Sequence, residues 1–415
     1  MRTALEVLLL YVALYPVVTA AVWIAGGLLF KLLDEGLSEE VPEGGWPGVT
    51  VLIPAYNEED VIATGVRAAL DSDYPDLELL VLDDGSTDGT ESAAIVAAAG
   101  DLRCHVIRDS VNRGKAERLN IGFALAGNDL VVVTDADAHL HPSAVRHLAA
   151  RIEASPMVAA VAGAPHVTNR TRLICAMQVL EVASIIGLIR RTQSLTGRVG
   201  IVAGVCGIFR RERVLAVGGY DGRMATEDID LTWRLLLVGW HTAYEPRALA
   251  GMEVPTTLAA LWAQRKRWAR GQGEVIHEHI HRLGLWRDHR LWLLAGESLA
   301  SILWVVLLVA SLVLAVLNLI FGYDVGFFGL GLAWGIAISV VATVQLVVGI
   351  TLSYEYDRWD PRSMLVGAIY PVLYWLASAA ASLRASIPAL VRGPRERRVV
   401  WSIPREQASS RVARR

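Results

Sequence analysis

The stretch VTVLIPAYNEEDVIATGVRAALDSDYPDLELLVLDDGSTDGT, residues 49–90, decides the fold of this chain. It opens with the β-branched run Val49–Ile53, continues through a helical pattern over Val61–Leu70, and returns to an apolar run over Leu77–Leu82. Two short apolar runs joined by an amphipathic helix predict a strand–helix–strand unit, and such a crossover makes the two strands parallel. The sequence therefore predicts an α/β fold built on a parallel sheet.

The same alternation continues beyond this unit. Further strand-like runs lie at His105–Ile107, Leu130–Thr134 and Val158–Ala162, and a helical pattern covers Ala116–Ala126. The repetition predicts a doubly wound, mainly parallel sheet, in which ligands bind beyond the carboxyl ends of the strands. Polar loops follow the first, second and fourth runs, namely Tyr56-Asn57-Glu58, Asp83-Asp84-Gly85-Ser86 and Asp135-Ala136-Asp137. We expect these loops to line one cleft.

The composition indicates a membrane protein. Hydrophobic residues make up 53% of the 415 residues and charged residues only 20%, which is more apolar than a soluble enzyme. The net charge of −3 argues against a nucleic-acid binder, because such a surface needs a basic excess. The three cysteines have no CxxC spacing, which excludes a zinc knuckle and a disulfide framework and fits a reducing compartment.

Long uncharged runs supply the apolar excess. Val7–Phe30 has 24 uncharged residues, about 36 Å as a helix. A cleaved signal peptide is the alternative, but the run continues ten residues past the candidate cleavage site Val18-Thr19-Ala20, which favours an anchor. Ser298–Gly322 and Val325–Tyr354 predict a helical hairpin. The run Ser363–Leu383 contains a proline, so spanning, kinked and re-entrant arrangements remain open.

Basic residues set the expected orientation. Three arginines between positions 282 and 290 precede the hairpin, which places the preceding region in the cytoplasm. We therefore divide the chain into five parts: anchor 1–33, linker 34–48, cytoplasmic domain 49–290, membrane region 291–391 and tail 392–415. The tail carries eight arginines against two glutamates. We expect it in the cytoplasm, although a full crossing by the fourth run would place it outside.

Three further clusters could carry chemistry. Carboxylates two residues apart, as in Asp135 and Asp137, bind hard divalent cations or simply form a solvated loop. Thr226-Glu227-Asp228 precedes the amphipathic stretch Ile229–Val238 and is either a helix cap or the presentation of a general base. Residues 264–268, QRKRW, are either an interfacial helix that contacts lipid or a site for a diphosphate and a sugar ring.

Residues 277–281, HEHIH, match the HExxH pattern of zinc hydrolases. The sequence offers no third ligand, so the histidines are better explained as the polar face of a helix at the membrane surface. A zinc hydrolase or a transporter is therefore the alternative from a different class of protein. Four membrane runs are few for a transporter, and the polar domain lacks repeat symmetry.

Taken in order, the motifs resemble those of the family-2 processive glycosyltransferases, the membrane synthases of cellulose, chitin and hyaluronan type. The similarity runs from the first anchor to about Trp401 and is strongest to the bacterial poly-β-1,6-N-acetylglucosamine synthase subfamily. The motifs that carry it are PAYNE (54–58), DDGSTDGT (83–90), NRGKAERLN (112–120), DAD (135–137), TEDIDLTWRL (226–235) and QRKRW (264–268).

The resemblance implies a GT-A-type fold and a role for each motif. Towards the donor, Tyr56 stacks on uracil, Glu58 and Asp84 hold the nucleoside, and Lys115 lies near the nucleotide. Asp135 and Asp137 face the UDP diphosphate, with Asp137 holding Mg²⁺ or Mn²⁺.

Other motifs imply the catalytic and acceptor side of the site. Thr226, Glu227 and Asp228 form the catalytic segment, in which Asp228 is the general base. A second group forms the acceptor and diphosphate edge or closes over the bound nucleotide, namely Gln264, Arg267, Trp268 and Trp401.

The resemblance also implies substrates and partners. These are UDP-N-acetylglucosamine, a growing β-1,6-linked polysaccharide, the lipid bilayer of a bacterial plasma membrane and, in many relatives, a small membrane subunit. Three segments depart from the subfamily pattern, at residues 163–166, 269–272 and 404–407. These departures leave open a chitin- or hyaluronan-type synthase, or a non-processive transferase with a lipid acceptor.

Overall fold

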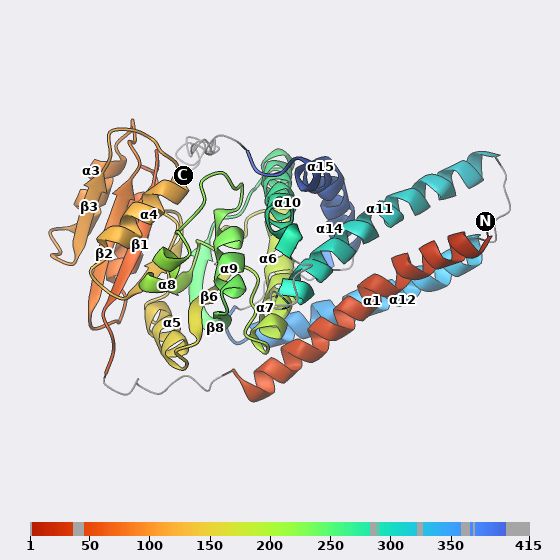
Figure 1. Ribbon diagram of the computed structural model, residues 1–415, viewed down its shortest axis with the longest axis horizontal. Coiled ribbons are helices and arrows are strands. Elements are labelled where there is room, and N and C mark those ends of the chain that lie inside the picture. Colours follow the sequence, from red (N-terminus) through yellow and green to blue (C-terminus); the bar gives the residue numbers. More distant parts are fainter. Residues whose placement is uncertain are drawn as a thin grey trace.

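An α/β body and a set of long helices make up the molecule (Figure 1). The helices α1 (Arg2–Leu33), α11 (Trp292–Phe321) and α12 (Phe327–Ser353) project from one side of the body, and α1 lies alongside α12. The computed structural model describes residues 2–35, 45–282, 289, 291–321, 327–357, 366–367 and 370–395.

An eight-stranded mixed sheet forms the centre of the body, in the order β3-β2-β1-β4-β7-β6-β8-β5. Strands β1 to β4 pair in parallel, and β6 pairs in parallel with β8. Strand β7 runs antiparallel to both of its neighbours, and β5 runs antiparallel to β8. The strands are β1 (Val49–Ala55), β2 (Leu77–Asp83), β3 (Cys104–Arg108), β4 (Leu130–Val133), β5 (His139–Leu140), β6 (Val158–Val167), β7 (Gly207–Arg210) and β8 (His241–Met252).

The predicted α/β fold class is confirmed, and all five predicted strands are present as β1, β2, β3, β4 and β6. The sequence did not reveal three strands. Strand β5 has two residues and β7 has four, too few for a period of two to emerge. Strand β8 contains Pro246, and a proline weakens a strand prediction because it lacks a backbone N–H group.

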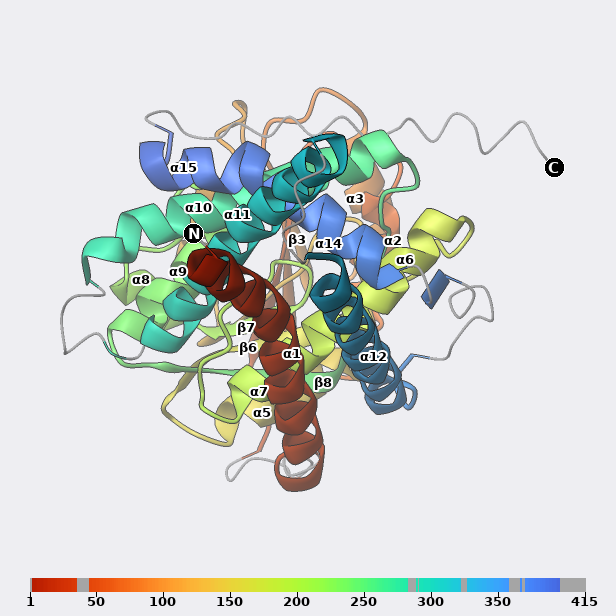
Figure 2. The ribbon, with the colours of Figure 1, turned by 90° about the vertical axis from the view of Figure 1, so that its right-hand side faces the viewer.

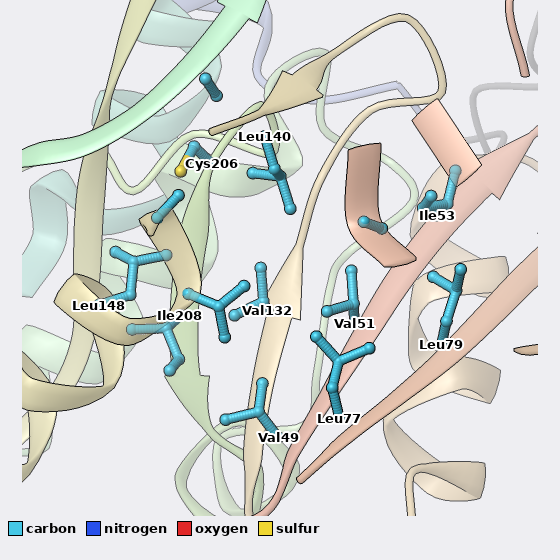
Figure 3. Packing of buried hydrophobic residues seen from close by; sticks show 14 of the residues in the cluster. Val49, Val51, Ile53, Leu77, Leu79, Val132, Leu140, Leu148, Cys206 and Ile208 are labelled. Atoms are coloured by element: carbon cyan, nitrogen blue, oxygen red, sulfur yellow. The ribbon is translucent and has the colours of Figure 1, made fainter. Parts of the chain in front are cut away.

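Alternate residues of the strands face two different helical layers, as a doubly wound sheet requires. Val51 and Ile53 pack with α2 (Ile62–Leu70), α3 (Thr90–Ala98) and α5 (Ala144–Glu153) in the core that Figure 3 shows. The intervening Leu52 packs on the opposite face. The helices of that face are α4 (Lys115–Leu125), α8 (Arg211–Ala216) and α9 (Glu227–Leu237).

A third layer of helices lies between the sheet and the projecting helices, and Figure 2 views it from the side of the latter. Helices α6 and α7 are continuous through a π-helical turn, as are α14 and α15, and α10 ends in a short 3₁₀ turn. The bounds are α6 (Leu173–Glu181), π turn (Val182–Ile186), α7 (Gly187–Ser194), α10 (Leu258–His279), 3₁₀ turn (Ile280–Arg282), α14 (Tyr370–Ala381), π turn (Ser382–Ser386) and α15 (Ile387–Arg392).

Four helices are long and apolar enough to cross a membrane: Val7–Leu33, Leu173–Ser194, Trp292–Phe321 and Gly335–Ser353. Three of them coincide with the predicted runs. Leu173–Ser194 was not predicted, and 56% of its apolar stretch is buried inside the protein, against 11–28% for the others. Leu173–Ser194 therefore packs against the α/β body, whereas the other three helices expose apolar side chains as a bilayer requires. The fourth predicted run, Ser363–Leu383, lies only partly within the described residues.

The end of α1 is joined to the body by ion pairs. Arg191 Nε lies 3.2 Å from Glu35 Oε2, and both side chains are almost fully buried. Arg151 pairs with Asp34 just before this point. Removing one partner of a buried pair leaves an uncompensated charge, so these contacts fix where the first membrane helix meets the body.

Helix α10 approaches α15 closely at a glycine. A Cβ atom built on Gly273 would lie 2.2 Å from the backbone oxygen of Ser386. We predict that Gly273→Ala forces the two helices apart and destabilises the protein by about 1–3 kcal/mol. Thermal unfolding of the detergent-solubilised protein measures the effect.

The matched control is Gly296→Ala, since nothing lies within 4 Å of a Cβ atom on that helical glycine. This control should unfold at the same or a slightly higher temperature, because alanine stabilises helices by about 0.5–1 kcal/mol relative to glycine. Equal unfolding temperatures for the two variants would contradict the packing argument.

Candidate active site

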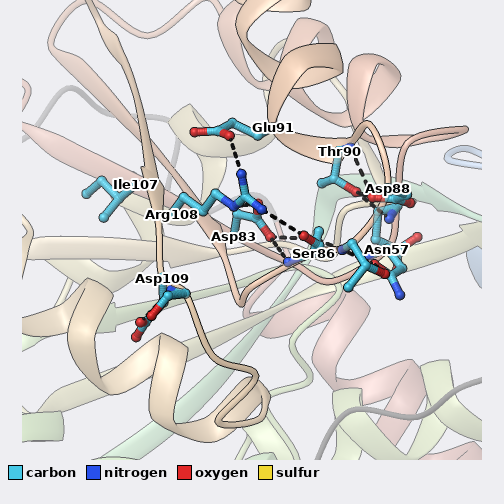
Figure 4. A network of polar contacts seen from close by, with 12 residues as sticks. Asn57, Asp83, Ser86, Asp88, Thr90, Glu91, Ile107, Arg108 and Asp109 are labelled. Atoms are coloured by element: carbon cyan, nitrogen blue, oxygen red, sulfur yellow. Dashed lines mark hydrogen bonds and ion pairs between the residues drawn. The ribbon is translucent and has the colours of Figure 1, made fainter.

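The loops after β1 and β2 are tied to each other at the carboxyl edge of the sheet (Figure 4). The backbone N–H of Asn57 donates to Ser86 Oγ at 2.9 Å, and Ser86 Oγ donates to Asp83 Oδ1 at 2.5 Å. The backbone N–H of Glu58 donates to Thr90 Oγ1 at 2.7 Å. These bonds fix the backbone that carries Tyr56 and Glu58 beside the end of β2.

Asp84 holds the loop that leads into α4. Its fully buried carboxylate accepts the backbone N–H groups of Arg113 at 3.0 Å and Gly114 at 2.7 Å. Burial raises the pKa of Asp84, although these two bonds act against the rise. Gly114 has φ 93°, a conformation that favours glycine, so the turn before Lys115 depends on both residues.

Lys115 and Asp135 form an ion pair of 2.5 Å between the start of α4 and the end of β4. Burial alone would lower the pKa of Lys115, but the negative charges of Asp135, Glu227 and Asp228 raise it overall. Lys115 therefore stays protonated at neutral pH. The same electrostatic contacts place the segment 226–228 beside the DAD loop, although the two are about ninety residues apart in sequence.

Asp228 lies in the first turn of α9, where the N–H of Ile229 donates to its Oδ1 at 2.9 Å. Burial and the neighbouring charge of Glu227 raise the pKa of Asp228 to about 6, against the opposing effects of Lys115 and Arg267. A carboxyl group with this pKa is mostly ionised at pH 7 yet still basic, which suits proton transfer.

The start of α9 is held by α10. The buried carboxylate of Glu274 accepts the backbone N–H of Ala225 at 2.7 Å and pairs with Arg270 at 2.5 Å. A Cβ atom on Gly271 would lie 2.0 Å from Thr226 Oγ1, so the two helices touch directly at this glycine. The position of Asp228 thus depends on α10.

Two histidines of the HEHIH segment, His277 and His279, contact other parts of the protein. His279 is buried, and its Nε2 lies 2.9 Å from Asp230 Oδ1; Asp230 also pairs with Arg234 at 2.8 Å. The prediction of a polar face at the membrane surface is therefore wrong for His279, because α10 turns this side chain into the protein. His277 Nδ1 lies 2.8 Å from the carbonyl oxygen of Leu390.

The QRKRW segment lies on α10, which begins at Leu258. Gln264 is half-buried, whereas Arg267 is exposed and the Trp268 side chain is 36% exposed. Arg267 is close enough to Asp228 to lower its pKa, so the exposed side of α10 faces the same site. Trp401 lies outside the described residues.

Asp135 and Asp137 supply oxygen donors at the end of β4. Among the described residues, no group of three or more His, Cys, Asp or Glu side chains is arranged to hold a metal ion. Two carboxylates nevertheless fit Mg²⁺ or Mn²⁺, because such ions keep several waters and take further oxygens from a bound phosphate. Asp135 pairs with Lys115, and the half-buried Asp137 lies two residues further along the same loop.

Tyr220 and Glu274 belong to the site's surroundings but were missed by the sequence analysis. Burial and the charges of Asp228 and Glu227 raise the pKa of Tyr220 well above its usual value, while its ring packs on Phe123 at 6.0 Å. A cavity of about 470 Å³ borders Tyr220 between α4 and α9. The only sequence signal for Glu274 was its position four residues after Arg270, a spacing typical of helical ion pairs.

The fold and site define a class of enzyme. The family model described as "Glycosyltransferase like family 2" matches residues 47–271, more than half of the chain. The chain belongs to this family and is a glycosyltransferase with a GT-A-like fold. The sequence-based predictions of family, fold and enzyme class are thereby confirmed.

Individual relatives extend the similarity into the helices. The chain is 29% identical over 407 residues to the poly-beta-1,6-N-acetyl-D-glucosamine synthase of Staphylococcus epidermidis, which covers 95% of this chain and 97% of the relative. It is 30% identical over 403 residues to the synthase of the same name from Staphylococcus aureus strain MSSA476, with the same coverage.

A solved structure supports the fold. The mannosyltransferase PcManGT from Pyrobaculum calidifontis, in complex with GDP-Man and Mn²⁺, superposes with a TM-score of 0.57 at 21% identity. The likeness covers 92% of this chain and 99% of the mannosyltransferase, so it includes the projecting helices as well as the sheet.

Asp84 gives a test of how the site is built. We predict that Asp84→Asn destabilises the protein by about 1–3 kcal/mol, because an amide cannot accept both N–H groups that the carboxylate accepts. Limited proteolysis should cleave the loop at residues 109–114 faster. Asp101→Asn is the control, since this carboxylate bonds to nearby Arg103 at the surface, and it should change stability by less than about 0.5 kcal/mol. A stable, protease-resistant Asp84→Asn protein would contradict this role.

Proposed function

We propose that this glycosyltransferase polymerises N-acetylglucosamine from UDP-N-acetylglucosamine into a β-1,6-linked polysaccharide and moves the product across the bacterial plasma membrane. The observation that carries the proposal is the similarity to poly-β-1,6-N-acetylglucosamine synthases over 95% of the chain, membrane helices included. The convergence of Lys115, Asp135 and Asp228 supports it chemically. In this proposal the sheet lies on the cytoplasmic side, where nucleotide sugars are made.

The donor would lie along the carboxyl edge of β1, β2 and β4. Tyr56 would stack on the base, and Glu58 and Asp84 would hold the nucleoside. Lys115 and Arg267 would balance the charge of the diphosphate. Asp137, with Asp135, would hold Mg²⁺ or Mn²⁺, which when bound stabilises the negative charge that develops on departing UDP.

Asp228 would act as the general base. A hydroxyl oxygen of the acceptor forms a bond to the anomeric carbon of the donor, and the bond from that carbon to the UDP oxygen breaks. The electron pair leaves with UDP, and the hydroxyl proton passes to Asp228. One base suffices for such an inverting transfer, because the leaving diphosphate needs charge stabilisation rather than a proton. Glu227 and Thr226 would position this carboxylate.

Helix α10 would bind the acceptor. Arg267 and Trp268 are exposed on this helix and Gln264 is half-buried, and Trp401 would close over the nucleotide. Helix α10 packs on α14 and α15 and lies between the sheet and the projecting helices (Figure 1). A polar polymer cannot cross lipid unaided, so α1, α11 and α12, together with a small accessory subunit, would line its path. The boundaries proposed from sequence, 1–33, 34–48, 49–290, 291–391 and 392–415, would separate these parts.

Product analysis tests the proposal. We expect the purified protein in nanodiscs with Mg²⁺ or Mn²⁺ to release UDP from UDP-N-acetylglucosamine alone among a panel of UDP-sugars. A β-1,6-specific hexosaminidase should digest the product. A resistant polymer would instead indicate a chitin-type synthase, and a lipid-linked monosaccharide would exclude polymerisation. No turnover with any UDP-sugar, even with the accessory subunit, would contradict the proposal.

The matched control is Asp228→Asn, which keeps the shape of the side chain and removes its basicity. We expect it to lower transfer at least about 100-fold, the lower range for loss of a general base, while UDP still binds. Chelation of the divalent ion should also stop transfer.

The pKa of Asp228 predicts that the plot of kcat/KM against pH has an acid limb, a range in which kcat/KM falls as the pH is lowered. A general base works only when deprotonated, so kcat/KM should fall as the pH drops through about 6. Glu227→Gln removes the neighbouring negative charge, lowers the pKa of Asp228 and should move the limb to lower pH. Lys115→Met removes a positive charge and should move it to higher pH. Identical limbs in all three proteins would show that another group controls the profile.

A further inference from the structure

Arg265 and Glu181 form a buried ion pair between α10 and α6. Both terminal nitrogens of the guanidinium bond to the two carboxylate oxygens, Nη1 to Oε1 and Nη2 to Oε2. The side chains are only 12% and 7% exposed. Two charges taken out of water stabilise a fold little, because desolvation offsets their attraction. A gain in stability therefore does not explain why this ion pair is buried.

The guanidinium of Arg265 also covers the Trp268 ring, with its central carbon 4.6 Å from the ring centroid. The three-residue spacing places the two side chains on the same side of α10. Trp268 remains 36% exposed, so part of the residue is open to solvent. The Arg265 guanidinium, held by both carboxylate oxygens of Glu181, thus packs on the Trp268 indole and supports it.

Glu181 is itself held in place from the membrane side. It is the last residue of α6 before the π-helical turn Val182–Ile186, and such turns concentrate at functional sites. Gln345 of α12 donates to the backbone oxygen of Ser184 at 3.2 Å, and a Cβ atom on Gly349 would lie 2.5 Å from Ser184 Cα. Helix α12 therefore packs tightly on the turn that presents Glu181.

We propose that Glu181 and Arg265 are positioning residues that hold the Trp268 indole as a fixed surface for stacking the acceptor sugar. The proposal rests on the proposed function, in which Trp268 binds the acceptor. A rigid indole binds a sugar ring without losing side-chain freedom on binding, so the pair acts on the acceptor and leaves the donor unaffected. Lysine cannot replace Arg265, because an ammonium lacks the planar fork.

Two variants separate this role from a structural one. Glu181→Gln combined with Arg265→Met removes both charges together, and such replacements usually leave stability unchanged. Arg265→Lys keeps the charge but loses the fork. We expect both to raise the KM for a short N-acetylglucosamine oligosaccharide acceptor by about 2- to 30-fold, the range of a cation–π contact. Products should be shorter, while the KM for the UDP-sugar and the unfolding temperature stay the same.

The control is Asp34→Asn, which breaks the Arg151–Asp34 pair between the end of α1 and the body. It should leave the acceptor KM unchanged. An unchanged acceptor KM in both test variants, or an equal rise in the KM for the UDP-sugar, would overturn the positioning role. A wild-type protein that transfers sugar to no acceptor would refute the proposed function itself, and the positioning role would fall with it.

Discussion

The contact on which the site depends is the packing of the start of α9 against α10. Because Gly271 has no side chain, Thr226 packs directly on the backbone of α10, and Glu274 of the same helix accepts the N–H group of Ala225. Two residues after Asp228, Asp230 pairs with His279 at the end of α10. Because α10 also carries the QRKRW segment, one helix sets both Asp228 and Trp268. The separation between Asp228 and Trp268 is thus set by the contact between α9 and α10.

Charge explains why the site needs that rigidity. Asp135, Glu227 and Asp228 gather around Lys115, so like charges repel wherever the single ammonium does not neutralise them. Repulsion and burial together leave Asp228 with a pKa of about 6 rather than the usual 4. A flexible loop would relax by moving the carboxylates apart. Here the carboxylates are held together by the end of β4, the start of α4 and the start of α9. The repulsion is therefore not relieved, and it keeps the pKa of Asp228 raised.

Periodicity and motif order predicted what depends on local sequence. Strands β1, β2, β4 and β6 and the polar loops after them follow from short apolar runs, and the family follows from the order of the motifs. The Glu181–Arg265 pair joins residues 84 positions apart, and no local pattern marks such a partner. His279 was misjudged for the same reason, since its partner Asp230 lies 49 positions away. Long-range polar pairing is set by tertiary packing, which a single sequence does not display.

The membrane-spanning helices, too, cannot be identified from the sequence alone, and here the packing of the helices supplies the missing information. Hydropathy cannot distinguish Leu173–Ser194, covered by protein, from a lipid-facing helix of equal length. With α1, α11 and α12 as the three lipid-facing candidates, the hairpin returns the chain to the side on which it started. Helices α14 and α15 then pack along α10, and Leu390 contacts His277. The described segment up to Arg395 therefore packs mainly against α10, beside the sheet and not along the length of the projecting helices.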